Sequence, residues 1–180
     1  GQYVTVRRQV EGREERRTYS IVPASDDREF RLGVRIQPDG RVSGDLAHTL
    51  KAGDRLEVGT PSGRFRTHVD PSRARCYAAF ASGSGVTPVL SIASRVLSCE
   101  LSSRFALFYG NRNAARTMFL EEILALKNRY LGRFDVHFFM SREPQAAEIL
   151  NGRLDAKKVR DIVGRLFDPT AVDEYFVCGP

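Results

Sequence analysis

A glycine-rich segment, Ser82-Gly83-Ser84-Gly85-Val86-Thr87-Pro88, has the residue types of a phosphate-binding loop. It follows an apolar run at residues 76–81 and opens a stretch with helical spacing. Glycines let the backbone approach a phosphate closely, and the amides and dipole at a helix N-terminus favour an anion. The segment lacks the third glycine of the dinucleotide fingerprint, which leaves an ordinary strand-to-helix loop as the alternative. Its strand–turn–helix context favours nucleotide binding.

A second candidate site is Arg17-Thr18-Tyr19-Ser20, which ends a segment with β-type alternation. Alternation places Arg17 and Tyr19 on one side of a strand. A guanidinium can pair with a pyrophosphate, and a tyrosine ring can cover a flat ring system, so this set suits a flavin nucleotide. The alternative is an edge strand with an exposed arginine and a half-buried tyrosine.

A third candidate site is Gly40-Arg41-Val42-Ser43, which enters a short helix expected over residues 43–50. Free amides at the start of a helix, together with a serine hydroxyl, form an anion site. In the simpler alternative, Ser43 only caps the first turn of the helix. Leu46 and Leu50 are four residues apart and share one face of this expected helix.

Periodicity divides the chain into two domains that must position these segments. Before residue 65, short alternating runs at residues 3–6, 18–21, 30–36 and 55–58 are separated by Gly, Pro, Asp and Ser turns, a pattern typical of a β-barrel. We expect this domain at residues 1–70, without its first segment.

After residue 71, strands alternate with helices, which predicts a doubly wound parallel α/β sheet at residues 71–180, without its last segment. The expected strands are residues 76–81, 105–109, 134–140 and 175–178, and the expected helices are residues 86–98, 117–130 and 155–167.

Composition excludes several functions. The 180 residues carry a formal charge of +6, but the basic residues are scattered, so no nucleic-acid partner is predicted. Cys76, Cys99 and Cys178 have neither disulfide nor zinc spacing, which is typical of a reduced cytoplasm. No apolar run approaches the roughly 20 residues of a membrane span, and no signal-peptide pattern opens the chain.

These motifs together resemble the ferredoxin–NADP⁺ reductase superfamily, whose FAD barrel carries an Arg-x-Tyr-Ser motif and whose second domain carries a glycine-rich loop ending in Thr-Pro. The segments Phe108-Tyr109-Gly110-Asn111-Arg112, Ser141-Arg142-Glu143 and Val177-Cys178-Gly179-Pro180 follow in the family's order. The sequence of these segments is most similar to that of reductase components of bacterial multicomponent oxygenases, particularly the phenylacetyl-CoA oxygenase group. The resemblance implies electron transfer from NADPH, or from NADH, through FAD to an oxygenase or ferredoxin.

Such reductases also carry a 2Fe–2S domain with four clustered cysteines, which this chain lacks. Any such cluster must therefore lie outside these residues or on a partner. The other hypotheses are an NADH-dependent flavin reductase of the same fold and a non-catalytic module that holds FAD or nucleotide.

The resemblance also implies residue roles. Ser20, Thr87 and Cys178 lie beside the reacting atoms, with Ser20 near flavin N5 and Cys178 contributing packing rather than a nucleophile. The residues implied for FAD are Arg17, Thr18, Tyr19, Ser20, Val34, Gly40, Val42 and Ser43. The residues implied for the nicotinamide nucleotide are Gly83, Gly85, Thr87, Pro88, Arg112, Ser141, Arg142, Arg153, Cys178, Gly179 and Pro180. Ser141 and Arg142 are expected at the ribose 2′-phosphate.

Overall fold

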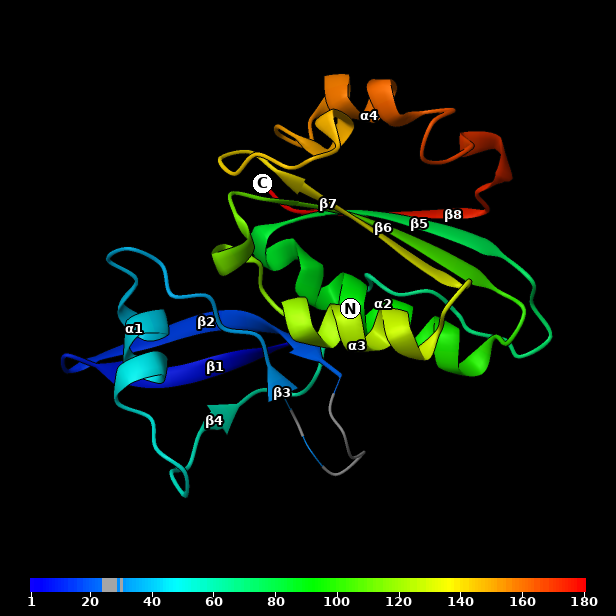
Figure 1. Ribbon diagram of the computed structural model, residues 1–180. Helices are drawn as coiled ribbons and strands as arrows, with labels where there is room; N and C mark the ends of the chain where they lie inside the picture. Colours follow the sequence, from blue (N-terminus) through cyan, green and yellow to red (C-terminus); the bar gives the residue numbers. More distant parts are fainter. Residues whose placement is uncertain (24–28, 30) are drawn as a thin grey trace. The chain divides into compact units, whose positions relative to one another are not determined.

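The computed structural model describes residues 1–23, 29 and 31–180. These residues form two compact units, Gly1–Arg66 and Thr67–Pro180. The first unit ends shortly before the boundary expected at residue 70. Each unit has its own sheet, and each is described separately below (Figure 1).

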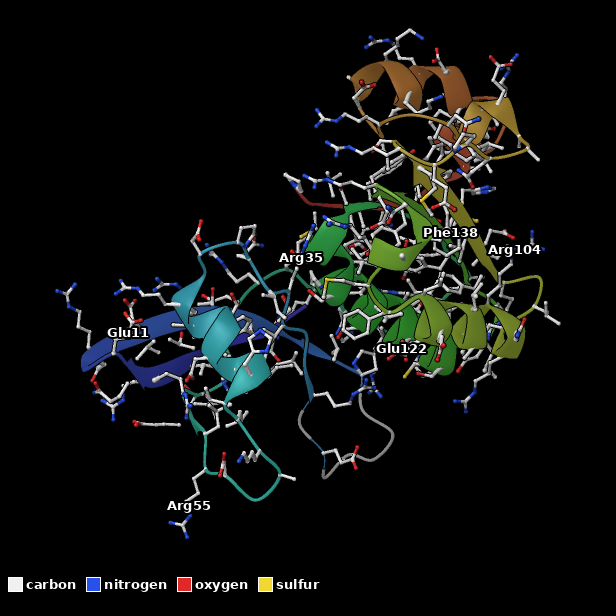
Figure 2. All side chains as sticks on the ribbon, turned by 60° about the vertical axis from the view of Figure 1, so that its left-hand side comes forward. Glu11, Arg35, Arg55, Arg104, Glu122 and Phe138 are labelled. Atoms are coloured by element: carbon white, nitrogen blue, oxygen red, sulfur yellow. The ribbon has the colours of Figure 1, made fainter. Side chains whose placement is uncertain are left out.

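The first unit is built on a hairpin of β1 (Tyr3–Val10) and β2 (Arg13–Val22). Its two turn residues, Glu11 and Gly12, have φ angles of 52° and 74°, as a two-residue turn between twisted antiparallel strands requires. Figure 2 shows Glu11 at the tip of this hairpin. The pairing places Tyr19 opposite Val4 and Arg17 opposite Val6, so these four side chains share one face.

Two short strands, β3 (Arg31–Leu32) and β4 (Glu57–Val58), complete an antiparallel sheet in the order β3-β2-β1-β4. This half-barrel confirms the expected fold class of the first half. The expected strand at residues 30–36 is wrong beyond Leu32, because the backbone from Gly33 leaves the ladder after one bond to the Ser20 carbonyl. Phe30, which began that expected strand, lies outside the described residues.

The short helix α1 (Arg41–His48) begins two residues earlier than expected. Gly40 is the N-cap and no side chain caps it, so the prediction that Ser43 caps the first turn is wrong. The helix ends before Leu50, with Thr49 as its C-cap, and the Thr49 amide makes the last helical bond to the Asp45 carbonyl.

The second unit contains a parallel sheet in the order β7-β6-β5-β8, as expected for a doubly wound fold. Parallel neighbouring strands cannot be joined by a hairpin, so the chain must cross over between them, and the helices form these crossovers. The strands are β5 (Cys76–Ser82), β6 (Arg104–Asn111), β7 (Phe134–Met140) and β8 (Glu174–Cys178). The short 3₁₀ turns are Gly83–Gly85, Ala114–Arg116, Glu148–Leu150 and Pro169–Ala171.

Helices cover both faces of this sheet. Figure 1 shows α2 (Val86–Cys99) and α3 (Leu120–Arg129) on one face and α4 (Ala156–Ile162) on the other. Alternation along β5 and β6 divides their side chains between two cores: Tyr77 and Phe105 stack on one side, and Phe80 and Phe108 on the other. The helix expected to extend to residue 167 ends early, because Gly164 adopts φ 72°.

A buried carboxylate ties the start of this unit to its core. Glu100 is fully buried and accepts hydrogen bonds from the Tyr77 and Ser103 hydroxyls and from the Asp70 amide. Burial raises the pKa of Glu100, but these hydrogen bonds outweigh it and hold the pKa below its usual value. The Arg133 guanidinium covers the end of α2 by donating to the carbonyls of Leu97 and Glu100.

Candidate functional site: two nucleotide-binding surfaces

The Arg17–Ser20 segment lies at the carboxyl end of β2, as expected. Tyr19 is half-buried, and burial raises the pKa of its hydroxyl, opposed by the neighbouring Arg17 charge. In the described part of the chain, neither the Tyr19 hydroxyl nor the Ser20 hydroxyl has a hydrogen-bond partner. Both groups can therefore bond to a ligand. Thr18 points to the exposed face, and Val34 is half-buried after β3.

The start of α1 presents backbone amides rather than the Ser43 hydroxyl. Ser43 Oγ donates its hydrogen to the Gly40 carbonyl and accepts from the Gln37 amide. A Cβ on Gly40 would lie 2.4 Å from that oxygen, so a side chain there would push Ser43 aside. The expected Ser43 hydroxyl donor is thus occupied. The first-turn amides of residues 41–43 have no acceptor within the helix and can face an anion.

In the second unit, the glycine-rich loop forms a tight turn between β5 and α2. Gly83 adopts φ 53°, which L side chains rarely adopt. Thr87 is 3% exposed, and its hydroxyl donates to the Ser84 carbonyl at 2.8 Å. The Thr87 hydroxyl hydrogen thus stabilises the loop, and the role of Thr87 beside the reacting atoms stays a prediction. Pro88 is buried in the first helical turn, where its missing N–H costs nothing.

The end of β8 packs directly on this loop. A Cβ on Gly85 would lie 2.1 Å from the Cys178 carbonyl oxygen, and a Cβ on Gly179 would lie 3.0 Å from the Ser82 backbone nitrogen. Gly179 also has φ 153°. Two glycines are therefore needed where the two chain segments cross. The structure thus brings the glycine-rich loop against Cys178 and Gly179, and the role of these residues in nucleotide binding stays a prediction.

A pocket of about 500 Å³ opens beside this crossing. It is lined by Ser82 of β5, by Leu154 and Asp155 at the start of α4, and by Cys178 and Gly179 after β8. Burial raises the pKa of the Cys178 thiol, so the thiol stays protonated near neutral pH. This supports the expectation of a packing role for Cys178. Pro180 also lines the pocket and is exposed.

Arginines gather at the carboxyl ends of β6 and β7. The Arg142 amide donates to the Arg112 carbonyl, and the Ser141 amide donates to the Asn111 carbonyl, so the two strand ends continue side by side. Arg153 joins them, because the Gly152 amide bonds to the Met140 carbonyl. Within the described residues, the side chains of Arg112, Arg142 and Arg153 are exposed and have no ion-pair or hydrogen-bond partner. Three unpaired guanidiniums at one sheet edge favour an anionic ligand.

The two units match two family models in the order in which these sites occur. Residues 1–67 match the oxidoreductase FAD-binding domain, and residues 80–180 match the oxidoreductase NAD-binding domain. The chain belongs to the ferredoxin reductase superfamily. Its glycine-rich loop and its Arg-Thr-Tyr-Ser segment therefore lie in an NAD-binding and an FAD-binding oxidoreductase domain, respectively.

Several relatives are similar over the whole chain. One subunit of the 1,2-phenylacetyl-CoA epoxidase from Escherichia coli is 34% identical over 180 residues, which cover all of this chain and 51% of that protein. A cytochrome P450 reductase from Amycolatopsis has a TM-score of 0.76 at 29% identity, covering 98% of this chain and 51% of that one. The flavohem-like FAD/NAD-binding domain of a Vibrio cholerae nitric oxide dioxygenase has a TM-score of 0.76 at 22% identity, covering 99% and 84%. The chain spans about half the length of the curated relatives it matches.

The residues present fit both cofactors of this superfamily. In the FAD-binding domain, Arg17 offers positive charge, and the unpartnered Tyr19 and Ser20 hydroxyls offer hydrogen bonds within the described part of the chain. In the NAD-binding domain, the glycine crossing lets backbone approach a ligand, and the exposed arginines offer charge for phosphate. These observations support FAD and a pyridine nucleotide without distinguishing NADPH from NADH.

Sequence reasoning missed the residues that hold these loops. The Tyr109 hydroxyl donates to the Gly83 carbonyl at 2.9 Å and so fixes the glycine-rich loop from β6. The Asn151 side-chain amide bonds to the Gln145 backbone twice, because its Oδ1 accepts from the Gln145 N–H and its Nδ2 donates to the Gln145 carbonyl. The Gln145 side-chain amide donates to the carbonyls of Phe138 and Leu150. These hydrogen bonds fix the conformation of the loop between Arg142 and Arg153. A long-range side-chain contact leaves no periodic signal in a sequence.

We predict that His137 makes the second unit acid-sensitive. Its ring stacks on Phe108 at 5.2 Å, and burial lowers its pKa, with Asp135 opposing. Below the unfolded-state pKa of about 6.5, the unfolded chain takes up a proton more readily than the native one, so stability falls as pH falls through that value. Melting temperatures at about pH 7.5 and 5.5 should drop less for His137→Phe than for wild type. Equal drops would contradict this.

Proposed function

We propose that this chain takes hydride from NADPH onto FAD and passes the electrons to a 2Fe–2S centre outside these 180 residues, and from there to an oxygenase. The observation that carries this is the 34% identity along the whole chain to one subunit of 1,2-phenylacetyl-CoA epoxidase. Component C of methane monooxygenase from Methylosinus trichosporium, 29% identical over 70% of this chain, supports the same role. Degradation of phenylacetate or another aromatic compound is the setting that the first relative suggests.

The proposed work of the chain is binding and placement. When bound, FAD would accept the hydride and release electrons singly, which the protein's own groups do not do. Arg17 and the first-turn amides of α1 bind the FAD pyrophosphate, Tyr19 packs against the flavin ring, and Ser20 donates a hydrogen bond near flavin N5. Glycines 83, 85 and 179 let the nicotinamide nucleotide approach the backbone. Cys178 keeps the nicotinamide pocket apolar.

The three described cysteines are free thiols, and no group of three or more His, Cys, Asp or Glu side chains that could hold a metal lies within the described residues. An iron–sulfur cluster of the plant type needs four thiolates. We therefore assign the cluster to a further domain or to a partner protein. No helix among the described residues is long and apolar enough to cross a membrane.

The test is anaerobic reduction of the FAD-loaded chain. We expect NADPH to bleach the visible flavin absorbance, ferricyanide to be reduced, and no iron to be present in the purified chain. Bound flavin that neither NADPH nor NADH reduces would point to a non-catalytic nucleotide-binding module. Bleaching by NADH alone would identify NADH as the hydride donor in place of NADPH and would leave the proposed flavin reduction unchanged. Stoichiometric iron would contradict the assignment of the cluster to another domain.

A further inference from the structure

A second arginine stands beside Arg17 in the FAD-binding domain. Arg41 is the first residue of α1, and its Nη2 lies 2.6 Å from Glu15 Oε1. Arg17 Nη1 lies 3.1 Å from the other oxygen, Glu15 Oε2. One carboxylate thus holds two guanidinium groups, one from β2 and one from α1.

The exposure of the three side chains shows which way each faces. The Glu15 side chain is 12% exposed, whereas those of Arg17 and Arg41 are 53% and 42% exposed. The carboxylate is therefore covered, and the two cations lie on the solvent side of it. Arg17 Nη1 also donates to the Arg16 carbonyl at 2.7 Å. Within the described residues, the remaining N–H groups of both guanidiniums have no partner.

This arrangement holds two positive charges close together. Such a pair repels itself in water, and an opposite charge between them offsets the repulsion. A second ion pair fixes α1 on the same hairpin, since Arg8 Nε donates to Asp45 Oδ2 at 2.7 Å. Because Glu15, Arg17 and Tyr19 alternate along β2, the two guanidiniums lie on the face that also presents the Tyr19 ring. Figure 1 shows α1 beside β1 and β2.

We propose that Arg41 is a second guanidinium for the diphosphate of the bound dinucleotide and that Glu15 is the positioning residue that holds Arg17 and Arg41 as a pair. A diphosphate carries two negative charges on adjacent phosphorus atoms, and a pair of forked donors matches both. Holding the pair before the ligand arrives removes part of the ordering cost of binding. This inference rests on FAD binding by the first unit.

The experiment compares FAD with riboflavin, which has the same ring system and no phosphate. We expect Arg41→Ala to weaken FAD binding about ten- to a hundredfold, as loss of a charge-assisted contact does. Riboflavin binding should not change. The matched control is Arg16→Ala, which removes an equal charge from the opposite face of β2, where Arg16 pairs with Glu14. It should change neither affinity, and melting temperatures verify folding.

The role of Glu15 is tested by Glu15→Gln and by the double variant with Arg41→Ala. If Glu15 positions Arg41, FAD affinity falls in Glu15→Gln, and Arg41→Ala then costs less than it does in wild type. A merely structural Glu15 would lower stability and leave the effect of Arg41→Ala unchanged. Equal effects of Arg41→Ala and Arg16→Ala on FAD, or equal losses of FAD and riboflavin, would overturn the proposal for Arg41.

Failure of this inference can be told apart from failure of the proposed function. Wild type that binds FAD tightly, with Arg41→Ala unaffected, overturns the inference alone. If Arg41→Ala weakens FAD binding but neither nucleotide reduces the FAD-loaded wild type, the inference is supported and the proposed oxidoreductase activity is contradicted. Wild type that binds no FAD contradicts both.

Discussion

Replacing Gly85 by alanine should destabilise the second unit by about 3 kcal/mol and abolish binding of the pyridine nucleotide, since overpacking into rigid neighbours reaches this size. The added Cβ would lie 2.1 Å from the Cys178 carbonyl oxygen and 2.8 Å from the Gly179 nitrogen. Both are backbone atoms, so no flexible side chain can move aside. Either α2 or the end of β8 must shift, and the pocket wall shifts with it.

The backbone conformation of Gly85 alone would predict that alanine stabilises the protein. Gly85 has φ −62° and ψ −12°, which any residue adopts, so alanine there should stabilise by about 0.4–1 kcal/mol through the unfolded chain. Gly44→Ala is the matched control, because it lies inside α1 and nothing would lie within 4 Å of its Cβ. Denaturant unfolding should show Gly44→Ala at or above wild-type stability. A Gly85→Ala variant as stable as wild type would contradict the close crossing.

Replacing Arg142 by alanine should lower kcat/KM for NADPH about ten- to a hundredfold and leave NADH nearly unchanged. The two nucleotides differ by one ribose 2′-phosphate, a dianion that needs donors to replace its water. Arg142 is exposed and, within the described residues, unpaired, so its charge is available to that phosphate. Arg153 and Arg112 lie near the same strand ends and should retain part of the affinity.

Arg104→Ala serves as the control for Arg142→Ala. Arg104 is an exposed arginine at the amino end of β6, the opposite end of the same sheet (Figure 2). Its loss removes the same charge far from the strand ends that carry Arg112 and Arg142, and kcat/KM should not change for either nucleotide. A general folding defect lowers both nucleotides together, whereas a lost phosphate contact lowers only NADPH. Equal loss for both nucleotides, or a wild-type preference for NADH, would contradict the NADPH assignment.

The fold was predictable because its signals are periodic. Buried parallel strands appear as continuous apolar runs, and β7 occurs at residues 134–140 as expected. Element ends were less predictable, because they depend on single backbone contacts. Several expected ends were wrong. For example, α3 starts at Leu120, α4 stops at Ile162, and the strand that includes β3 leaves the ladder after Leu32.

The candidate site was predictable where a residue type has few other uses. Glycines in a strand–turn–helix context marked the loop, and the structure brings Gly85 against Gly179, which lies at the far end of the chain. The sequence did not show which groups the hydroxyls of Ser43 and Thr87 contact. Each hydroxyl has a single hydrogen, and a nearby carbonyl in the turn takes it.

By itself the sequence determined the two-domain order, the strand and helix types, and the candidate nucleotide-binding segments, because these depend on periodicity and on glycine, arginine and tyrosine at fixed spacings. Only the tertiary structure decided which polar groups remain available to a ligand. Arg17 and Arg41 meet on Glu15, whereas Arg112, Arg142 and Arg153 meet no carboxylate within the described residues. Pairing is settled by distances between residues far apart in the chain, and no local pattern encodes those distances.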